Sequence, residues 1–142
     1  MASKVFFTDF RTTHDQSLTV KLKKLIRRAG IDSIDFEGKF VAIKMHFGEP
    51  GNLAFLRPNY ARAVVDVIKE QGGKPFLTDC NTLYPGRRKN ALEHLYAAAE
   101  NGFNYITCDC PVIIGDGLRG TDDVEVPVHN GELVKNAKIG HA

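Results

Sequence analysis

Several features are missing from this sequence, and each absence removes a class of function. No apolar run is long enough to cross a bilayer, and residues 1–9 lack the long apolar stretch of a signal peptide. We therefore expect a cytoplasmic protein with no membrane partner. The net charge is only +2 and the basic residues are scattered, which argues against nucleic acid as a partner.

Cysteine is scarce and its spacing is unusual. Cys80, Cys108 and Cys110 are an odd number without the spacing of a disulfide framework, so we expect reduced thiols. One residue separates Cys108 from Cys110, whereas zinc sites and thioredoxin-like motifs usually have two, and no second cysteine pair follows. The sequence therefore predicts no metal or cluster cofactor held wholly within this chain.

The serine and P-loop motifs of several common enzymes are absent. Residues 115–120 have the spacing Gly-x-Gly-x-x-Gly after the predicted strand 112–114, but their glycines predict a loop, and the helix that a dinucleotide site requires is not predicted to follow. Neither Gly-x-x-x-x-Gly-Lys-Ser/Thr nor Gly-x-Ser-x-Gly occurs. These observations weigh against a standard dinucleotide site, a P-loop and an α/β-hydrolase nucleophile.

Apolar stretches and helical stripes alternate along the 142 residues, a length that suits one domain with one core. Predicted strands cover residues 4–8, 39–46, 75–78, 105–107 and 112–114, and predicted helices cover residues 15–29, 59–71 and 91–101. The stretch 39–46 is almost continuously apolar, as in a strand buried on both faces of a parallel sheet. This alternation predicts a three-layer α/β fold with a mainly parallel sheet and helices on both faces.

The end of the sequence predicts a C-terminal β-hairpin at the sheet edge. Alternating valines from Val124 to Val128 precede Asn130-Gly131, which matches a type I′ turn, and a return strand at 133–134. No stop signal or closing element follows. We therefore expect residues 1–142 to be a single α/β domain and the truncated amino-terminal lobe of a longer protein.

Residues 76–94 hold the strongest candidate for a functional site. A predicted strand leads into Thr-Asp-Cys-Asn, a Tyr-Pro-Gly turn and three cations, before Asn90 starts a helix with an Asn-x-x-Glu pattern. A helix N-terminus carries a partial positive charge, so the cations at 87–89 would strengthen its attraction for an anion. The alternative is a solvated loop in which Asp79 and Asn81 only cap the turn.

Topology should bring several polar clusters to one edge of the sheet, because right-handed crossovers make the strands parallel and open α/β sheets bind ligands at strand carboxyl ends. The clusters at these ends are Asp9 and residues 46–49, 79–81 and 108–110. The candidate catalytic residues are His46, Glu49, Asp79 and Cys80, and the candidates for binding a small anionic ligand are Asn81, Arg87 and Arg88. Because Glu49 and Asp79 would repel a bare polyanion, the sequence favours a mixed-charge ligand or a metal-bound anion of unknown metal.

Two of these residues also have plainer interpretations. His46 suits a general base or a metal ligand, or it is simply a hydrogen-bonded histidine at a strand end. Cys80 near a helix N-terminus and Arg87 would have a lowered pKa, whereas a buried apolar cysteine would be inert. If side chains fill the edge and leave no cavity, the protein is a non-catalytic scaffold or partner-binding domain.

Four segments of the sequence resemble a known family. They are Lys4-Val5-Phe6-Phe7-Thr8-Asp9, Lys44-Met45-His46-Phe47-Gly48-Glu49, Thr78-Asp79-Cys80-Asn81-Thr82-Leu83-Tyr84 with Arg87 and Asn90, and Pro111-Val112-Ile113-Ile114-Gly115-Asp116-Gly117-Leu118. Over nearly the whole chain they look like the uncharacterised iron-sulfur-centre proteins of domain-of-unknown-function family 362.

The resemblance implies a bacterial or archaeal cytoplasmic protein with a longer parent chain and a downstream ferredoxin-type domain whose cysteine quartets bind [4Fe-4S] clusters. This sequence contains no such quartet, so no cluster ligand can be assigned to its residues. The chain would then be the amino-terminal α/β lobe of a ferredoxin-linked protein and would bind a substrate or accept electrons. Whether it is an enzyme stays open, with the substrate-binding part of a redox enzyme as one interpretation.

Overall fold

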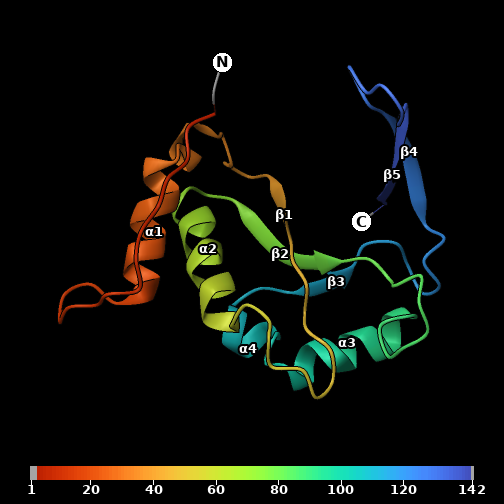
Figure 1. Cartoon of the computed structure of the whole chain (residues 1–142), viewed down its shortest axis with the longest axis horizontal. Helices are drawn as coiled ribbons and strands as arrows, with labels where there is room; N and C mark the ends of the chain where they lie inside the picture. Colours follow the sequence, from red (N-terminus) through yellow and green to blue (C-terminus); the bar gives the residue numbers. More distant parts are fainter. Residues whose placement is uncertain (1–2, 142) are drawn as a thin grey trace.

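Three parallel strands form the central sheet of the computed structural model, which describes residues 3–141 (Figure 1). The strands are β1 Phe40–Lys44, β2 Lys74–Asp79 and β3 Val112–Ile114, and β2 lies between the other two. Ile43 lies beside Leu77, and Leu77 lies beside Val112. The predicted α/β fold with a parallel sheet is confirmed.

Five helical elements accompany the strands within the described residues. They are α1 Leu18–Arg28, the 3₁₀ turn η1 Ile31–Ser33, α2 Pro58–Glu70, α3 Ala91–Glu100 and the single turn α4 Tyr105–Cys108. Ser17 caps α1 and Asn90 caps α3, each through a side-chain oxygen that accepts a backbone N–H of the first turn. All three predicted helices are present, although the first begins after Ser17 rather than at Asp15. Within residues 3–141, no helix is long and apolar enough to span a membrane.

One hydrophobic core lies between the sheet and helices α2, α3 and α4. It joins Val65 of α2, Ala98 of α3 and Cys108 of α4 to Leu77 and Ile114 of the sheet. These helices therefore cover the same face, as expected when two right-handed crossovers proceed in the same direction along a sheet. The predicted three-layer arrangement, with helices on the second face as well, is not confirmed.

Two predicted strands are absent from the described part of the chain. Residues 4–8 are extended, mostly exposed and paired with no strand, so Asp9 does not follow a strand; its carboxylate accepts a hydrogen bond from Lys21 Nζ at 2.5 Å. Residues 105–107 belong to α4, because Asn104 Oδ1 accepts hydrogen bonds from two backbone N–H groups of that turn. The capping asparagine outweighs the strand preference of the residues that follow it.

The first strand and the hairpin also differ from their predictions. β1 is not buried on both faces, because its residues alternate between exposed side chains on one face and half-buried side chains on the other. The hairpin is formed by β4 Asp123–Pro127 and β5 Asn136–Gly140, which pair antiparallel as a separate two-stranded sheet instead of extending the parallel one. Leu133 and Val134, predicted as the return strand, lie exposed in the loop before β5.

Candidate functional site

Arg88 is the centre of a polar cluster at the carboxyl edge of the sheet. Its side chain is only 3% exposed, and each of its three nitrogens donates a hydrogen bond. Nε donates to Glu49 Oε1 at 2.7 Å, Nη1 donates to Asp79 Oδ2 at 3.2 Å, and Nη2 donates to Tyr84 Oη at 2.5 Å and to Glu49. Burial alone would lower the pKa of Arg88, but the bonds to Glu49 outweigh it and raise the pKa. A buried guanidinium is thus shared by two carboxylates.

The loop between β2 and α3 holds Arg88 in this position. The backbone N–H of Thr82 donates to the carbonyl of Arg88 at 2.9 Å, and Asn90 caps α3 two residues later. Asp79 ends β2 and Glu49 follows the end of β1, so both carboxylates approach from the same edge. The expected convergence of these two strand ends is present in the structure.

Asp79 is buried and receives contacts from several cations and donors. Its Oδ1 accepts hydrogen bonds from Lys44 Nζ at 2.8 Å and from the backbone N–H of Cys80 at 2.9 Å, and His94 Nε2 lies 3.6 Å from Oδ2. Burial raises the pKa of Asp79, but the contacts with His94, Lys44 and the Cys80 N–H outweigh it and lower the pKa to about 2. A carboxylate with so low a pKa is a weak general base near neutral pH, which favours a role in orienting cations.

His46 and Tyr84 form the exposed side of the cluster. Tyr84 Oη donates to Glu49 Oε1 at 2.6 Å, and the bonds from Arg88 hold the pKa of Glu49 below its usual value. His46 Nε2 lies 2.9 Å from Arg88 Nη2, and its Nδ1 lies 2.9 Å from the backbone nitrogen of Gly48. Both neighbours only donate and a neutral imidazole has one lone pair, so one of these contacts occupies the lone pair that a general base would use. The structure brings His46 into the cluster and favours its plainer interpretation as a hydrogen-bonded strand-end histidine.

His94 lies behind the cluster and was missed by the sequence analysis. It is fully buried on α3, packs edge-on against Phe47 with ring centroids 5.8 Å apart, and neither ring nitrogen has a hydrogen-bond partner in the described residues. The buried stripe that α3 forms with Ala91 and Ala98 has the helical spacing that could have identified it. Its 3.6 Å approach to Asp79 makes it part of the environment of that carboxylate.

Asn81 has a positioning role in this structure. Its Nδ2 donates to Asp116 Oδ1 at 2.9 Å and to the carbonyl of Gly117 at 2.8 Å, and its backbone N–H donates to both Asp116 oxygens. These bonds tie the loop after β2 to the loop after β3. The sequence analysis did not select Asp116, although the rule that polar residues gather after parallel strands applies to it as well.

Arg87 and the cysteine pair lie away from the cluster, which corrects their predicted positions. Arg87 is 40% exposed and forms a bidentate ion pair with Glu100 at the end of α3, with N–O distances of 2.5 and 2.9 Å. Cys108 and Cys110 precede β3 and therefore lie toward its amino end, because residues 105–108 are helical. Both are buried, and burial raises the pKa of Cys110 to about 11.

A pocket of about 180 Å³ opens beside Asp79 on the sheet face opposite the helices. Its lining includes apolar Ala42, Phe76 and Ile139 and polar Lys44, Thr78 and Cys80. β5 closes one side by crossing so near the end of β3 that a Cβ atom on Gly140 would lie 2.6 Å from a backbone carbon of Gly115. Only glycine fits there, and the hairpin thereby becomes a wall of the pocket.

The charges in the pocket are those of Lys44 and of Asp79, which accepts a hydrogen bond from the Lys44 ammonium, whereas Cys80 contributes a neutral thiol. The Lys44 side chain is 70% exposed, and it is the one cation among the described residues that line this pocket. Burial, together with the charge of Asp116, raises the pKa of Cys80. The predicted lowering is wrong because Arg87 is bound to Glu100, and because burial and the charge of Asp116 outweigh the charge of Lys44, which lowers the pKa of Cys80.

The described residues contain no group of three or more His, Cys, Asp and Glu side chains placed to hold a metal ion. A family model described as "Domain of unknown function (DUF362)" matches residues 41–142. No curated protein and no solved structure matches the chain.

Proposed function

The chain belongs to the DUF362 family, and we propose that its α/β lobe binds a small anionic ligand at the carboxyl edge of the sheet. The observation that carries the proposal is the pocket beside Asp79, which Lys44 supplies with a positive charge. Parallel α/β sheets bind ligands at this edge, so the position and the charge point to the same use.

Lys44 replaces the two arginines as the residue that meets the anion. Arg88 already donates to Glu49, Asp79 and Tyr84, and Arg87 is bound to Glu100 outside the cluster. The Lys44 ammonium bonds to Asp79 through one contact and keeps most of its surface in solvent. An ammonium has three donors, so a ligand oxygen can bind while the contact with Asp79 persists.

Charge balance favours a ligand with no more than one negative group. Lys44 and Arg88 are offset by Asp79 and Glu49, so the cluster has no surplus of positive charge for a bare polyanion. The volume of about 180 Å³ is small beside the ~300–1,000 Å³ of sites for larger ligands, which suits a short ligand. Because Ala42, Phe76 and Ile139 form the apolar wall, the best fit is a monocarboxylate with a short apolar body.

Thermal shift measurements with butyrate, phosphate and sulfate, each alone and with Mg²⁺, test this proposal on the whole chain. We expect butyrate to raise Tm in the native protein and Lys44→Met to abolish that rise relative to its own ligand-free Tm. Lys74→Met is the matched control, because Lys74 is exposed on the same sheet face at the opposite end of β2. An equal butyrate effect in Lys44→Met, or an equal effect of chloride at the same ionic strength, would overturn the proposal.

The resemblance to iron-sulfur proteins supports a wider proposal, in which this lobe is the substrate-binding part of a redox enzyme and works beside a ferredoxin module. The coding sequence downstream of residue 142 tests it directly. Cys-x-x-Cys-x-x-Cys runs there would support the proposal, and a complete reading frame without them would contradict it.

A scaffold or partner-binding domain is the second candidate, and apolar exposure favours it. Phe40 of β1 is 80% exposed and Tyr105 of α4 is 68% exposed, and both line a second pocket of about 380 Å³. Exposed apolar surface of this kind often marks a protein interface. Absence of any ligand effect on Tm would favour this candidate over the first.

A further inference from the structure

β1 has an open edge. β2 pairs with one side of β1, and within residues 3–141 no strand pairs with the other. The N–H of Met45 and the carbonyl of Lys39 bond to β2, so the odd-numbered residues of this segment face β2. Because successive residues of a strand direct their backbone groups to opposite sides, Phe40, Ala42 and Lys44 present theirs at the open edge. Such an edge is a template for another strand.

The helix on that side of the molecule is also poorly covered. α1 packs against α2 beyond the open edge of β1, yet none of its residues is buried (Figure 1). A cavity of about 440 Å³ lies between α1 and the N-terminal segment and is lined by residues 4–7, Leu25 and Arg28. The apolar stripe of an amphipathic helix normally packs on a sheet, so α1 lacks the strand that would lie beneath it.

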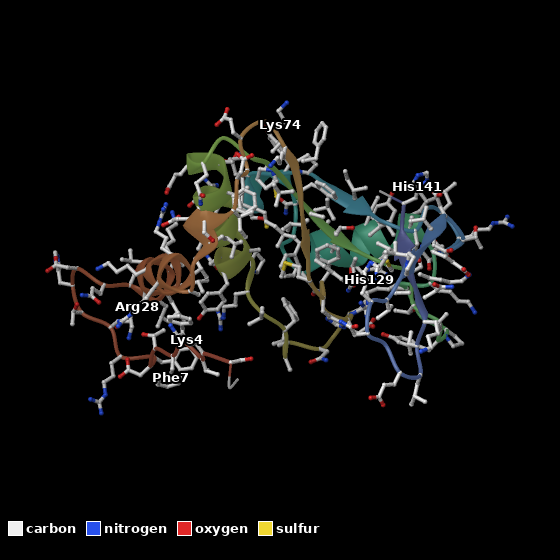
Figure 2. All side chains as sticks on the ribbon, turned by 90° about the horizontal axis from the view of Figure 1, so that it is seen from above. Lys4, Phe7, Arg28, Lys74, His129 and His141 are labelled. Carbon is white, nitrogen blue, oxygen red and sulfur yellow. The ribbon has the colours of Figure 1, made fainter. Side chains whose placement is uncertain are left out.

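Residues 4–8 have the properties of that missing strand. Among the described residues, no hydrogen bond joins their backbone groups to a partner. Val5 and Phe7 are 88% and 84% exposed whereas Phe6 is 38% exposed, which is the alternation of a strand with one covered face. Val, Phe and Thr are strand-forming residues. Figure 2 places Lys4 and Phe7 near Arg28 of α1, and both views show the segment apart from β1.

We propose that residues 4–8 dock on the open edge of β1 as a fourth parallel strand beneath α1. The segment is joined to β1 through one helix, and a right-handed strand–helix–strand connection gives the parallel direction. Residues 9–17 span up to about 30 Å at ~3.3 Å each, so the segment can reach the edge. A second copy is a poorer occupant, because residues 9–17 tether the segment close to the edge and so raise its effective concentration there.

Docking also changes the charge at the carboxyl edge, whether or not the ligand proposal holds. In a parallel pair the carboxyl ends coincide, so Asp9 would move from Lys21 toward the end of β1, where Lys44 and His46 lie. The docked segment would add a carboxylate to the polar edge. Docking and release of residues 4–8 would therefore change both the access to the site and its charge.

Amide hydrogen exchange measured by NMR on the full chain tests the proposal. We expect the amides of Phe40, Ala42 and Lys44 to exchange at least about tenfold faster in Phe6→Pro than in the native protein, because proline cannot join the ladder. The amides of Val41 and Ile43, which face β2, are internal references that should not change. Phe10→Pro is the matched control, since Phe10 is 81% exposed and outside the segment.

Three outcomes would overturn the proposal. One is equal exchange of the edge amides in the native protein and in Phe6→Pro. Another is an equal acceleration in Phe10→Pro, which would show a general effect of proline. The third is protection that rises with protein concentration together with a dimer in light scattering, which would identify a second copy as the occupant. Amide–amide NOEs between residues 4–8 and β1 would support docking directly.

Discussion

Arg87 and Arg88 are neighbours in the sequence, but they belong to two different regions of the molecule. Arg88 is 3% exposed and is held by carboxylates from two strand ends, whereas Arg87 is 40% exposed and bonds to one carboxylate on the surface of α3. Both arginines make more than one contact at hydrogen-bond distance. They differ in how much stability is lost when one partner is removed, because water can solvate an exposed charge that is left alone but cannot solvate a buried one.

The largest effect is expected for Arg88→Ala. Asp79 and Glu49 would remain as carboxylates without their shared cation, and we expect the free energy of unfolding to fall by about 3–5 kcal/mol. Urea denaturation followed by circular dichroism measures this loss, and an unchanged m-value would show that the same structure unfolds.

A double-mutant cycle sharpens this prediction. Glu49→Ala in the Arg88→Ala background should cost less than Glu49→Ala in the native protein, because the two residues are coupled. Strict additivity would contradict the shared-guanidinium description.

Acid should reveal an intermediate effect through Asp79. Its pKa is about 2 in the folded state against an ordinary 3.8, so the folded state holds this carboxylate charged more strongly than the unfolded state does. The stabilisation is fully present above about pH 4 and is lost as pH falls toward 2, with a contribution of about 2 kcal/mol. Urea denaturation between pH 5 and 2 should show a steeper decline in the native protein than in Asp79→Asn. Equal slopes would mean that other carboxylates control acid stability.

The smallest effect is expected for Arg87→Ala. The partner Glu100 is exposed and returns to water when Arg87 is removed, so the urea midpoint should stay within error of the native value. Raising the salt concentration should erase any residual difference, because ions screen exposed charges. A loss comparable to that of Arg88→Ala would remove the distinction between the two regions.

Short sequence patterns predicted the starts of most helices, because helix starts depend on the chemistry of a few neighbouring residues. Asn90 and its Asn-x-x-Glu pattern marked the start of α3, because capping acts within a few residues. The helix predicted over residues 59–71 begins one residue earlier, at Pro58, whose fixed backbone angle suits the first helical position. The prediction at 105–107 was wrong because the capping effect of Asn104 was not weighed against strand preference. Strand 4–8 could not be judged from its own residues, since a strand exists only when a partner accepts its backbone bonds.

The sequence predicted which strand ends meet at the site, but it did not predict which way the side chains at those ends point. The crossover rule brought His46, Glu49 and Asp79 to one edge, and the structure agrees. The rule says nothing about which of two adjacent arginines turns inward. That choice depends on the loop closed by the Thr82 N–H and the Arg88 carbonyl, a contact that no spacing in the sequence announces.

The three thiols differ in burial, and this difference allows the rate at which the core opens to be measured on the native chain. Cys108 and Cys110 are closed inside the core, so an alkylating reagent can reach them only in molecules that have opened, whereas Cys80 lies partly at the surface. Counting added mass over time in the native protein would therefore time the opening of the core without any engineered label. The alkylation rates of Cys108 and Cys110, compared with that of Cys80, would therefore rank variants by how fast their cores open.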